Sequence, residues 1–175
     1  MPERPVILTG FMGSGKSCVG QMLANSLGCP FVDLDALIVA DAGMSINEIF
    51  AREGEEAFRN RESACLERVL QKGVAVIASG GGVVLSPVNR RLMRSQGIVV
   101  NLTASLPVIL ERLKGATDRP LYSGDNAANR VAALMEERQH FYADADIRID
   151  TDNKSVEDVS AQIIKILKGL PAWVC

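Results

Sequence analysis

Short apolar, β-branched stretches alternate with longer amphipathic stretches along the whole chain. The short stretches predict strands, and the longer ones, with apolar residues three or four positions apart, predict helices. Strands that alternate with helices are typical of βαβ units, whose strands lie parallel in one sheet. The sequence therefore predicts an α/β protein with strands at Pro5–Thr9, Pro30–Asp33, Val74–Ala78, Ile98–Leu102 and Ile147–Asp150.

Capping residues mark three of the predicted helix starts. Ser45-Ile-Asn-Glu48 reads as a capping box, and Ser155-Val-Glu-Asp158 opens the last helix in a similar way. Ser86 stands directly before a proline, which is favoured at the first helical position. The apolar residues of the last helix recur at helical spacing and predict a core-facing stripe of Ile163, Ile166, Leu167 and Leu170.

Length and composition predict one domain over residues 1–175. The 19 basic residues nearly balance the 21 acidic ones, giving a formal net charge of −2, and 47% of the residues are hydrophobic. Nucleic-acid and membrane-surface binders normally carry a basic excess or stripe, so neither class of partner is expected. No apolar stripe beyond the core helices is evident, and a monomer is the expected state.

The predicted location is the cytoplasm. The apolar run Val6–Leu8 is too short for a signal or membrane span. The four cysteines form no CxxC pair and no cluster with the single histidine, so neither a zinc site nor a haem site is expected. In a chain of this size they are expected to be reduced thiols.

Candidate chemistry begins directly after the first predicted strand, at Gly10-Phe-Met-Gly-Ser-Gly15-Lys16-Ser17, followed by a helical pattern through Leu27. A glycine-rich loop with this spacing between a strand and a helix matches the phosphate-binding loop, or P-loop. Its N–H groups and the helix N-terminus attract phosphates. Lys16 can reach the β- and γ-phosphates, and the Ser17 hydroxyl is an oxygen ligand suited to Mg²⁺. Nucleotide binding is therefore predicted.

The second predicted strand ends in two carboxylates, in Phe31-Val-Asp33-Leu-Asp35. In a parallel sheet the carboxyl ends of the strands face the ligand crevice. Two positions apart on an extended segment, the side chains share a side, so that one supports the Mg²⁺ shell while the other meets a substrate hydroxyl. The alternative is that Asp35, directly before Ala36, caps a helix.

Arginines and glycines further along the chain complete the candidate chemistry. Arg59 lies four residues after Glu55 on a helical stretch, so a surface ion pair is the simple alternative to a binding role. Gly80-Gly-Gly82 follows the third strand, where glycines allow either a ligand close to the backbone or merely a tight turn. Arg119 and Arg138 add cations suited to a transferring phosphate or a carboxylate.

Residues 114–126 differ in character from the rest of the chain. They are polar, contain two glycines and show little periodicity. This composition is expected of a mobile surface segment between two helices, and it makes the segment a candidate lid.

Taken together, the residues resemble the shikimate kinase family. The similarity runs from Ile7 to about Leu167. It implies a three-layer α/β/α P-loop kinase fold with a five-stranded parallel sheet, a substrate-binding helical region at residues 36–70, and a lid. The ordered matches are Gly10–Ser17, Phe31–Asp35, Ile49-Phe50, Gly54-Glu55, Phe58-Arg59, Glu62, Gly80–Gly82, Arg119-Pro-Leu121 and Arg138-Gln-His-Phe-Tyr142.

The resemblance implies transfer of the γ-phosphate of ATP to the 3-hydroxyl of shikimate, a step towards chorismate and the aromatic amino acids. It makes ATP and Mg²⁺ the cofactors and shikimate the small-molecule partner. Asp35, Lys16 and Arg119 become the catalytic residues, with Asp35 as the base or the group that orients the attacking oxygen. Ser17 ligates Mg²⁺ and Asp33 supports its water shell.

The same resemblance assigns the remaining contacts. The expected ATP-binding residues are Gly13, Ser14, Gly15, Lys16, Ser17 and Cys18 at the phosphates, Arg119 at the transferring phosphate, and Arg112 and Lys154 at the adenine. The expected shikimate-binding residues are Arg59 and Arg138 at the carboxylate and Asp35, Gly80, Gly81 and Gly82 at the ring hydroxyls.

Two other functions stay open on the sequence. A P-loop kinase for another polyol acid, such as gluconate or quinate, would share the loop, although Asp35 with Arg59 fits a ring that bears hydroxyls and one carboxylate. The second open function is that of a nucleotide-dependent switch or non-catalytic binding domain. A guanine-nucleotide switch carries Asn-Lys-x-Asp, and Asn153-Lys154-Ser-Val156 lacks the aspartate.

Overall fold

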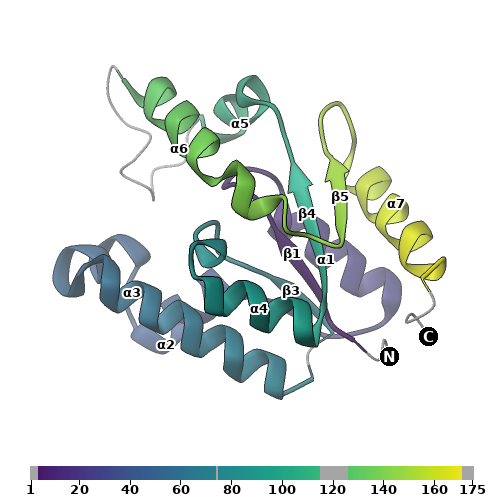
Figure 1. Ribbon diagram of the computed structural model, residues 1–175, viewed down its shortest axis with the longest axis horizontal. Helices are drawn as coiled ribbons and strands as arrows, with labels where there is room; N and C mark the ends of the chain where they lie inside the picture. The colour runs from purple at the N-terminus through teal and green to yellow at the C-terminus, as the bar shows by residue number, and fades with distance from the viewer. Residues whose placement is uncertain (1–3, 74, 115–125, 171–175) are drawn as a thin grey trace.

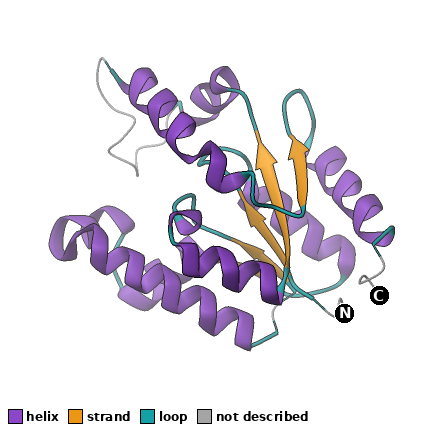
Figure 2. Cartoon of the chain, viewed as in Figure 1, coloured by secondary structure: helices purple, strands orange, loops and turns teal. Residues whose placement is uncertain are grey.

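The strands are filled with apolar residues because helices cover both faces of the sheet. The computed structural model describes residues 4–73, 75–114 and 126–170. In this part of the chain, five parallel strands form one sheet in the order β2-β3-β1-β4-β5 (Figures 1 and 2). The element bounds are β1 Val6–Thr9, α1 Lys16–Leu27, β2 Phe31–Asp33, α2 Leu34–Ala42, α3 Ile46–Gln71, β3 Val76–Ala78, the 3₁₀ helix η1 Val83–Leu85, α4 Pro87–Gln96, β4 Ile98–Thr103, α5 Leu106–Leu113, α6 Ala127–Tyr142, β5 Ile147–Asp150 and α7 Val156–Lys168.

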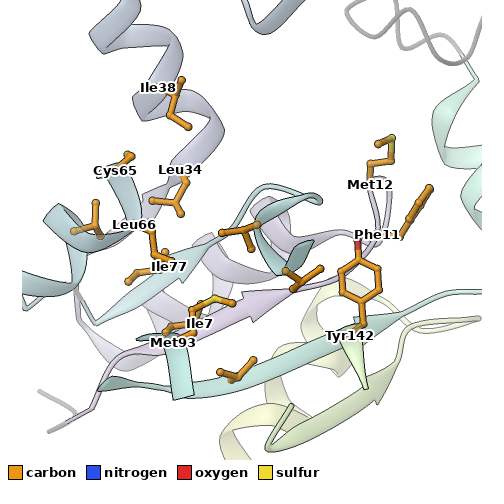
Figure 3. Packing of buried hydrophobic residues seen from close by; sticks show 14 of the residues in the cluster. Ile7, Phe11, Met12, Leu34, Ile38, Cys65, Leu66, Ile77, Met93 and Tyr142 are labelled. Atoms are coloured by element: carbon orange, nitrogen blue, oxygen red, sulfur yellow. The ribbon is translucent and has the colours of Figure 1, made fainter. Parts of the chain in front are cut away.

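Side chains that alternate along each strand divide the core into two clusters. Ile7 of β1 packs with residues of α2, α3, α4 and α6 on one face of the sheet, and Figure 3 shows this cluster from close by. Val6 and Leu8 point to the other face and pack with residues of α1 and α7. Burying one such side chain contributes about 1.5–3 kcal/mol. The sheet with helices on both faces confirms the expected three-layer fold.

All five predicted strands form, with small shifts at their ends. β1 and β2 begin one residue later than predicted, because Pro5 and Pro30 have no N–H to donate to a strand ladder. β4 runs one residue further, to Thr103, and β5 has the predicted bounds. Val74, the predicted start of the third strand, lies outside the described residues.

The predicted helix caps are confirmed. The Ser45 hydroxyl accepts a hydrogen bond from the Glu48 N–H at 3.2 Å, and the Glu48 carboxylate accepts one from the Ser45 N–H at 2.9 Å. Ser155 and Asp158 form the same reciprocal pair at the start of α7. The Ser86 hydroxyl accepts from the N–H of Asn89. The stripe on α7 also packs as expected, with Ile163 and Leu167 fully buried and Ile166 and Leu170 half-buried.

The predicted helical region at residues 36–70 consists of α2 and α3, and α3 is sharply kinked. Gly54 inside α3 has φ 85° and ψ 172°, a conformation that non-glycine residues rarely adopt. The kink changes the direction of the helix between Phe50 and Phe58, whose rings lie 4.8 Å apart. Residues of both halves of α3, among them Ile49 and Phe58, belong to the core cluster of Ile7.

None of the helices in the described ranges has the length and hydrophobicity needed to cross a bilayer.

Candidate active site

The P-loop joins the central strand β1 to α1, in the predicted context. α1 begins at Lys16, and Gly15 occupies the position before its first turn. The Lys16 ammonium donates hydrogen bonds to the carbonyls of Gly10 and Phe11, at 2.8 and 3.1 Å. The lysine side chain thus folds back over the loop and places a positive charge beside the α1 N-terminus, where an anionic ligand is favoured.

Ser17 and Asp33 come together across the sheet edge. The Ser17 hydroxyl donates a hydrogen bond to the Asp33 carboxylate. Adjacent hydroxyl and carboxylate oxygens fit Mg²⁺, which is usually held by one or two such side chains together with phosphate oxygens and waters. The described residues hold no group of three or more His, Cys, Asp and Glu side chains arranged for a metal. Ser17 and Asp33 are the residues here that could hold Mg²⁺ together with ligand oxygens.

Asp33 and Asp35 do not share an extended segment, and this part of the prediction is wrong. The strand β2 ends at Asp33 and α2 begins at once, so Asp35 lies in the first helical turn. The alternative role for Asp35, helix capping, is also wrong. Asp33 is the capping residue, because its side chain accepts a hydrogen bond from the N–H of Ala36 at 3.2 Å. Asp33 uses its second carboxylate oxygen for Ser17.

The loop Gly80–Gly82 touches both acidic and basic residues of the site. A Cβ atom at Gly80 would lie 2.5 Å from the Glu62 carboxylate and 2.7 Å from that of Asp35. At Gly82 it would lie 2.0 Å from the Arg59 guanidinium. Charged side chains of α2 and α3 therefore pack directly against the backbone of the loop, and a side chain at Gly80 or Gly82 would displace them.

Arg59 is held between two glutamates on α3. Its guanidinium donates to Glu62 at 2.9 Å and pairs with Glu55 at 3.3 Å. The Glu55 side chain is exposed, whereas that of Glu62 is 1% exposed. The predicted surface pair with Glu55 exists, but the buried partner Glu62 fixes the guanidinium. Burial raises the pKa of Glu62, while the charge of Arg59 acts to lower it.

A cavity of about 520 Å³ lies at the carboxyl edge of the sheet, within the size range of small-molecule sites. Its lining combines Arg59 of α3 with Arg138 of α6, which is 8% exposed, and with Asp35. The P-loop reaches this lining through Met12, and α3 contributes the aromatic rings of Phe50 and Phe58. Two cations from separate helices, the carboxylate of Asp35, the glutamates Glu55, Glu62 and Glu137, and an apolar wall are arranged around a single space.

Arg112 and Lys154 both contact Thr151, at a second place beside the P-loop. The Arg112 guanidinium donates to the carbonyl of Gly13 at 3.1 Å and to the hydroxyl of Thr151 at 3.2 Å. Lys154 follows on the same turn after β5, and its ammonium donates to the carbonyl of Asp150 at 2.7 Å. Neither lines the cavity of Arg59 and Arg138, so the two sets of predicted contacts lie in separate places.

The sequence matches a known family along nearly its whole length. The family model for shikimate kinase matches residues 12–168. The chain belongs to the shikimate kinase family. The shikimate kinases of Geobacter metallireducens and Geobacter sulfurreducens are each 55% identical to it, over 95% and 94% of this chain and 93% and 91% of those proteins.

Solved structures agree with the family assignment. The shikimate kinase of Acinetobacter baumannii in complex with shikimate is 33% identical, with a TM-score of 0.90, and the match covers 95% of this chain and 93% of that one. A gluconokinase from Sinorhizobium meliloti, 17% identical with a TM-score of 0.55, shares only the fold. The chain therefore has the P-loop kinase fold of shikimate kinases.

The residues that the family resemblance assigned do not all lie in the described part of the chain or at the site. Arg119 and most of the predicted lid at residues 114–126 lie outside the described residues. Cys18, predicted among the phosphate contacts, lies in the first turn of α1 with an exposed side chain. The fold brings the other predicted residues to the P-loop, to the contacts of Arg112 and Lys154 around Thr151, or to the cavity and the glycine loop beside it.

Two residues of the site received no role from the sequence. Glu62 is the buried partner of Arg59, and its signal was an acidic residue three positions after an arginine on a helix. Tyr142 of α6 donates a hydrogen bond to the carbonyl of Gly81 at 2.5 Å. No local pattern predicts that contact, because the two residues are 61 positions apart.

The raised pKa of Glu62 predicts a pH-dependent stability. A group whose pKa is raised on folding stabilises the folded chain below its unfolded pKa, here 4.5, and loses this contribution as the pH rises through the folded-state value. We expect Glu62→Gln to remove this dependence of stability on pH. The melting temperature of the variant minus that of the unaltered chain should therefore increase as the pH rises from 4.5. Thermal melts between pH 4 and 8 measure the difference.

Glu55→Gln is the matched control, because Glu55 contacts the same arginine but is 64% exposed. Its difference from the unaltered chain should stay nearly flat over this range. A flat difference for Glu62→Gln as well would contradict the assignment of this pH dependence to Glu62.

Proposed function

We propose that this chain transfers the γ-phosphate of ATP to the 3-hydroxyl of shikimate, giving shikimate 3-phosphate and ADP. Membership of the shikimate kinase family supports the reaction class. The observation that carries the proposal for this chain's own residues is the cavity that Asp35, Arg59 and Arg138 share beside the P-loop. A ring that bears hydroxyls and one carboxylate needs this combination of charges.

The two arginines bind the carboxylate of the acceptor. Arg59 and Arg138 come from different helices, so their guanidinium groups approach a carboxylate from two directions and fix its orientation. Glu62 and Glu55 hold Arg59 in place before the ligand arrives. The backbone of Gly80–Gly82 contacts the ring hydroxyls, and the place of Gly81 and Gly82 in the cavity lining supports this assignment.

Asp35 acts on the attacking oxygen. It accepts the proton of the 3-hydroxyl as that oxygen forms its bond to the γ-phosphorus, while the bond from this phosphorus to the β–γ bridging oxygen breaks and ADP departs. The close approach of Asp35 to Gly80 supports this role, because Gly80 belongs to the loop that contacts the hydroxyls. Positioning of the two reactants supplies much of the rate in such a transfer.

The P-loop binds the phosphates of ATP. Lys16 and the N–H groups from Gly13 to Cys18 face the phosphates, and Ser17 with Asp33 would hold Mg²⁺. The metal, when bound, neutralises negative charge on the β- and γ-phosphates. Arg119 contributes a further cation at the transferring phosphate, and Arg112 and Lys154 contact the adenine. The Arg112 link between Gly13 and Thr151 supports a base site next to the P-loop.

The remaining properties follow the same proposal. The chain acts as a monomer in the cytoplasm, on small molecules rather than on nucleic acid or a membrane. Residues 1–175 form one domain, with residues 36–70 as the substrate-binding region and residues 114–126 as the lid that excludes water.

Release of ADP from Mg–ATP, measured with shikimate, quinate and gluconate at equal concentrations, tests the proposed function. We expect strong turnover with shikimate alone. Equal or faster turnover with quinate or gluconate would assign the cavity to another polyol acid. ATP binding without turnover of any of the three would favour a binding role instead.

A further inference from the structure

Tyr142 is a buried residue that links α6 to the glycine loop. It is the last residue of α6, is 7% exposed, and belongs to the core cluster that contains Phe11 and Met12 of the P-loop (Figure 3). Its hydroxyl donates a hydrogen bond of 2.5 Å to the carbonyl of Gly81. A phenylalanine would fill the same space in the cluster, so the hydroxyl has a purpose other than packing.

We propose that Tyr142 is a positioning residue for the acceptor substrate. It fixes the position of the Gly81–Gly82 peptide relative to Arg138. This inference rests on the proposed function. The peptide bond is planar and trans, so fixing the Gly81 carbonyl also fixes the Gly82 N–H, which points the opposite way. Arg138 lies one helical turn before Tyr142 on the same face of α6. One side chain therefore sets the distance between two predicted contacts of the acceptor.

The surroundings of Tyr142 keep its hydroxyl protonated. Burial raises its pKa to about 12, and the nearby positive charge of Arg138 opposes this rise only in part. The hydroxyl therefore donates to Gly81 throughout the neutral range. Burying a hydroxyl without a partner is unfavourable, and the Gly81 carbonyl is the partner that the structure supplies.

A second contact joins the same turn of α6 to the segment after the glycine loop. Loss of the Tyr142 hydroxyl should therefore leave this turn of α6 folded. The Arg90 guanidinium lies 4.6 Å from the centre of the Phe141 ring and donates to the carbonyls of Val84 and Leu85 in η1. Tyr142→Phe keeps the ring and these contacts. It removes the bond to Gly81 and the hydrogen bond between the hydroxyl and Arg138, which are the two contacts that link the glycine loop to this turn of α6.

The test compares Tyr142→Phe with the unaltered chain in two ways: steady-state kinetics with each substrate varied, and calorimetric titration with shikimate. A net hydrogen bond corresponds to about a five- to tenfold change in an equilibrium constant. We expect the KM and Kd for shikimate to rise by about this factor, with the KM for ATP and kcat changed less than about twofold, because the lost orientation affects ground state and transition state alike.

Ile163→Val is the matched control. Ile163 is fully buried on the opposite face of the sheet, so this change lowers the melting temperature without touching the cavity. An unchanged shikimate KM in Tyr142→Phe overturns the positioning role. The role is also overturned if the KM values for shikimate and ATP rise together, and by the same amount as in Ile163→Val at an equal loss of melting temperature. An unaltered chain that neither binds nor phosphorylates shikimate overturns the proposed function and this role together.

Discussion

Replacement of Asp35 by asparagine is expected to lower turnover of shikimate by on the order of 10²-fold or more. Asparagine has the same shape but cannot take up the proton of the 3-hydroxyl. ATP binding should stay nearly intact, because the P-loop and Ser17 belong to other elements. Rapid-quench or coupled ADP assays give turnover, and titration with a fluorescent ATP analogue gives the nucleotide affinity.

Asp41→Asn is the control for this variant. Asp41 lies on the same helix α2, and its carboxylate pairs with Arg68 away from the cavity of Arg59 and Arg138. It should keep close to full turnover. If Asp35→Asn also keeps full turnover, Asp35 has no part in the proton transfer.

Replacement of Arg59 by methionine is expected to have two separable effects. The Kd for shikimate should rise by on the order of 10²-fold, because a charge-assisted pair of hydrogen bonds to the carboxylate is lost. The free energy of unfolding should fall by about 2 kcal/mol, because the buried Glu62 loses its hydrogen-bond donor. Calorimetric titration measures the first effect, and denaturant unfolding measures the second.

The double variant Arg59→Met with Glu62→Gln separates the two effects. Removing the uncompensated carboxylate should restore most of the lost stability, while shikimate binding stays as weak as in the single variant. Recovery of binding together with stability would mean that Arg59 supports the fold and does not contact the acceptor.

Much of the fold was predictable because its determinants are local. The apolar runs at Val6–Leu8 and Ile98–Leu102 are long enough to be strands and too short to be helices, and both are strands. Ser45 and Ser155 satisfy backbone N–H groups within three residues, so their caps are visible in the sequence. The spacing of Gly10–Ser17 predicted the P-loop, because the strand and the helix that such a loop requires are its neighbours in the sequence.

The features that the sequence did not predict depend mostly on contacts between distant segments. Tyr142 and Gly81 are 61 positions apart, and nothing near either residue indicates the partner. The strand β2 ends where predicted, at Asp33, but α2 begins at the next residue, and this makes Asp33 a cap and Asp35 a first-turn residue rather than an extended pair. The kink at Gly54 was equally hidden, because glycine in a helical pattern has several meanings until its φ is known.

A crystal structure of the chain with shikimate and ADP tests the central claim most directly. The account predicts the shikimate carboxylate between Arg59 and Arg138, with the 3-hydroxyl within hydrogen-bond distance of Asp35 and facing the P-loop. A ring bound elsewhere, or bound in this cavity with its carboxylate towards Asp35 and its 3-hydroxyl away from the P-loop, would contradict it.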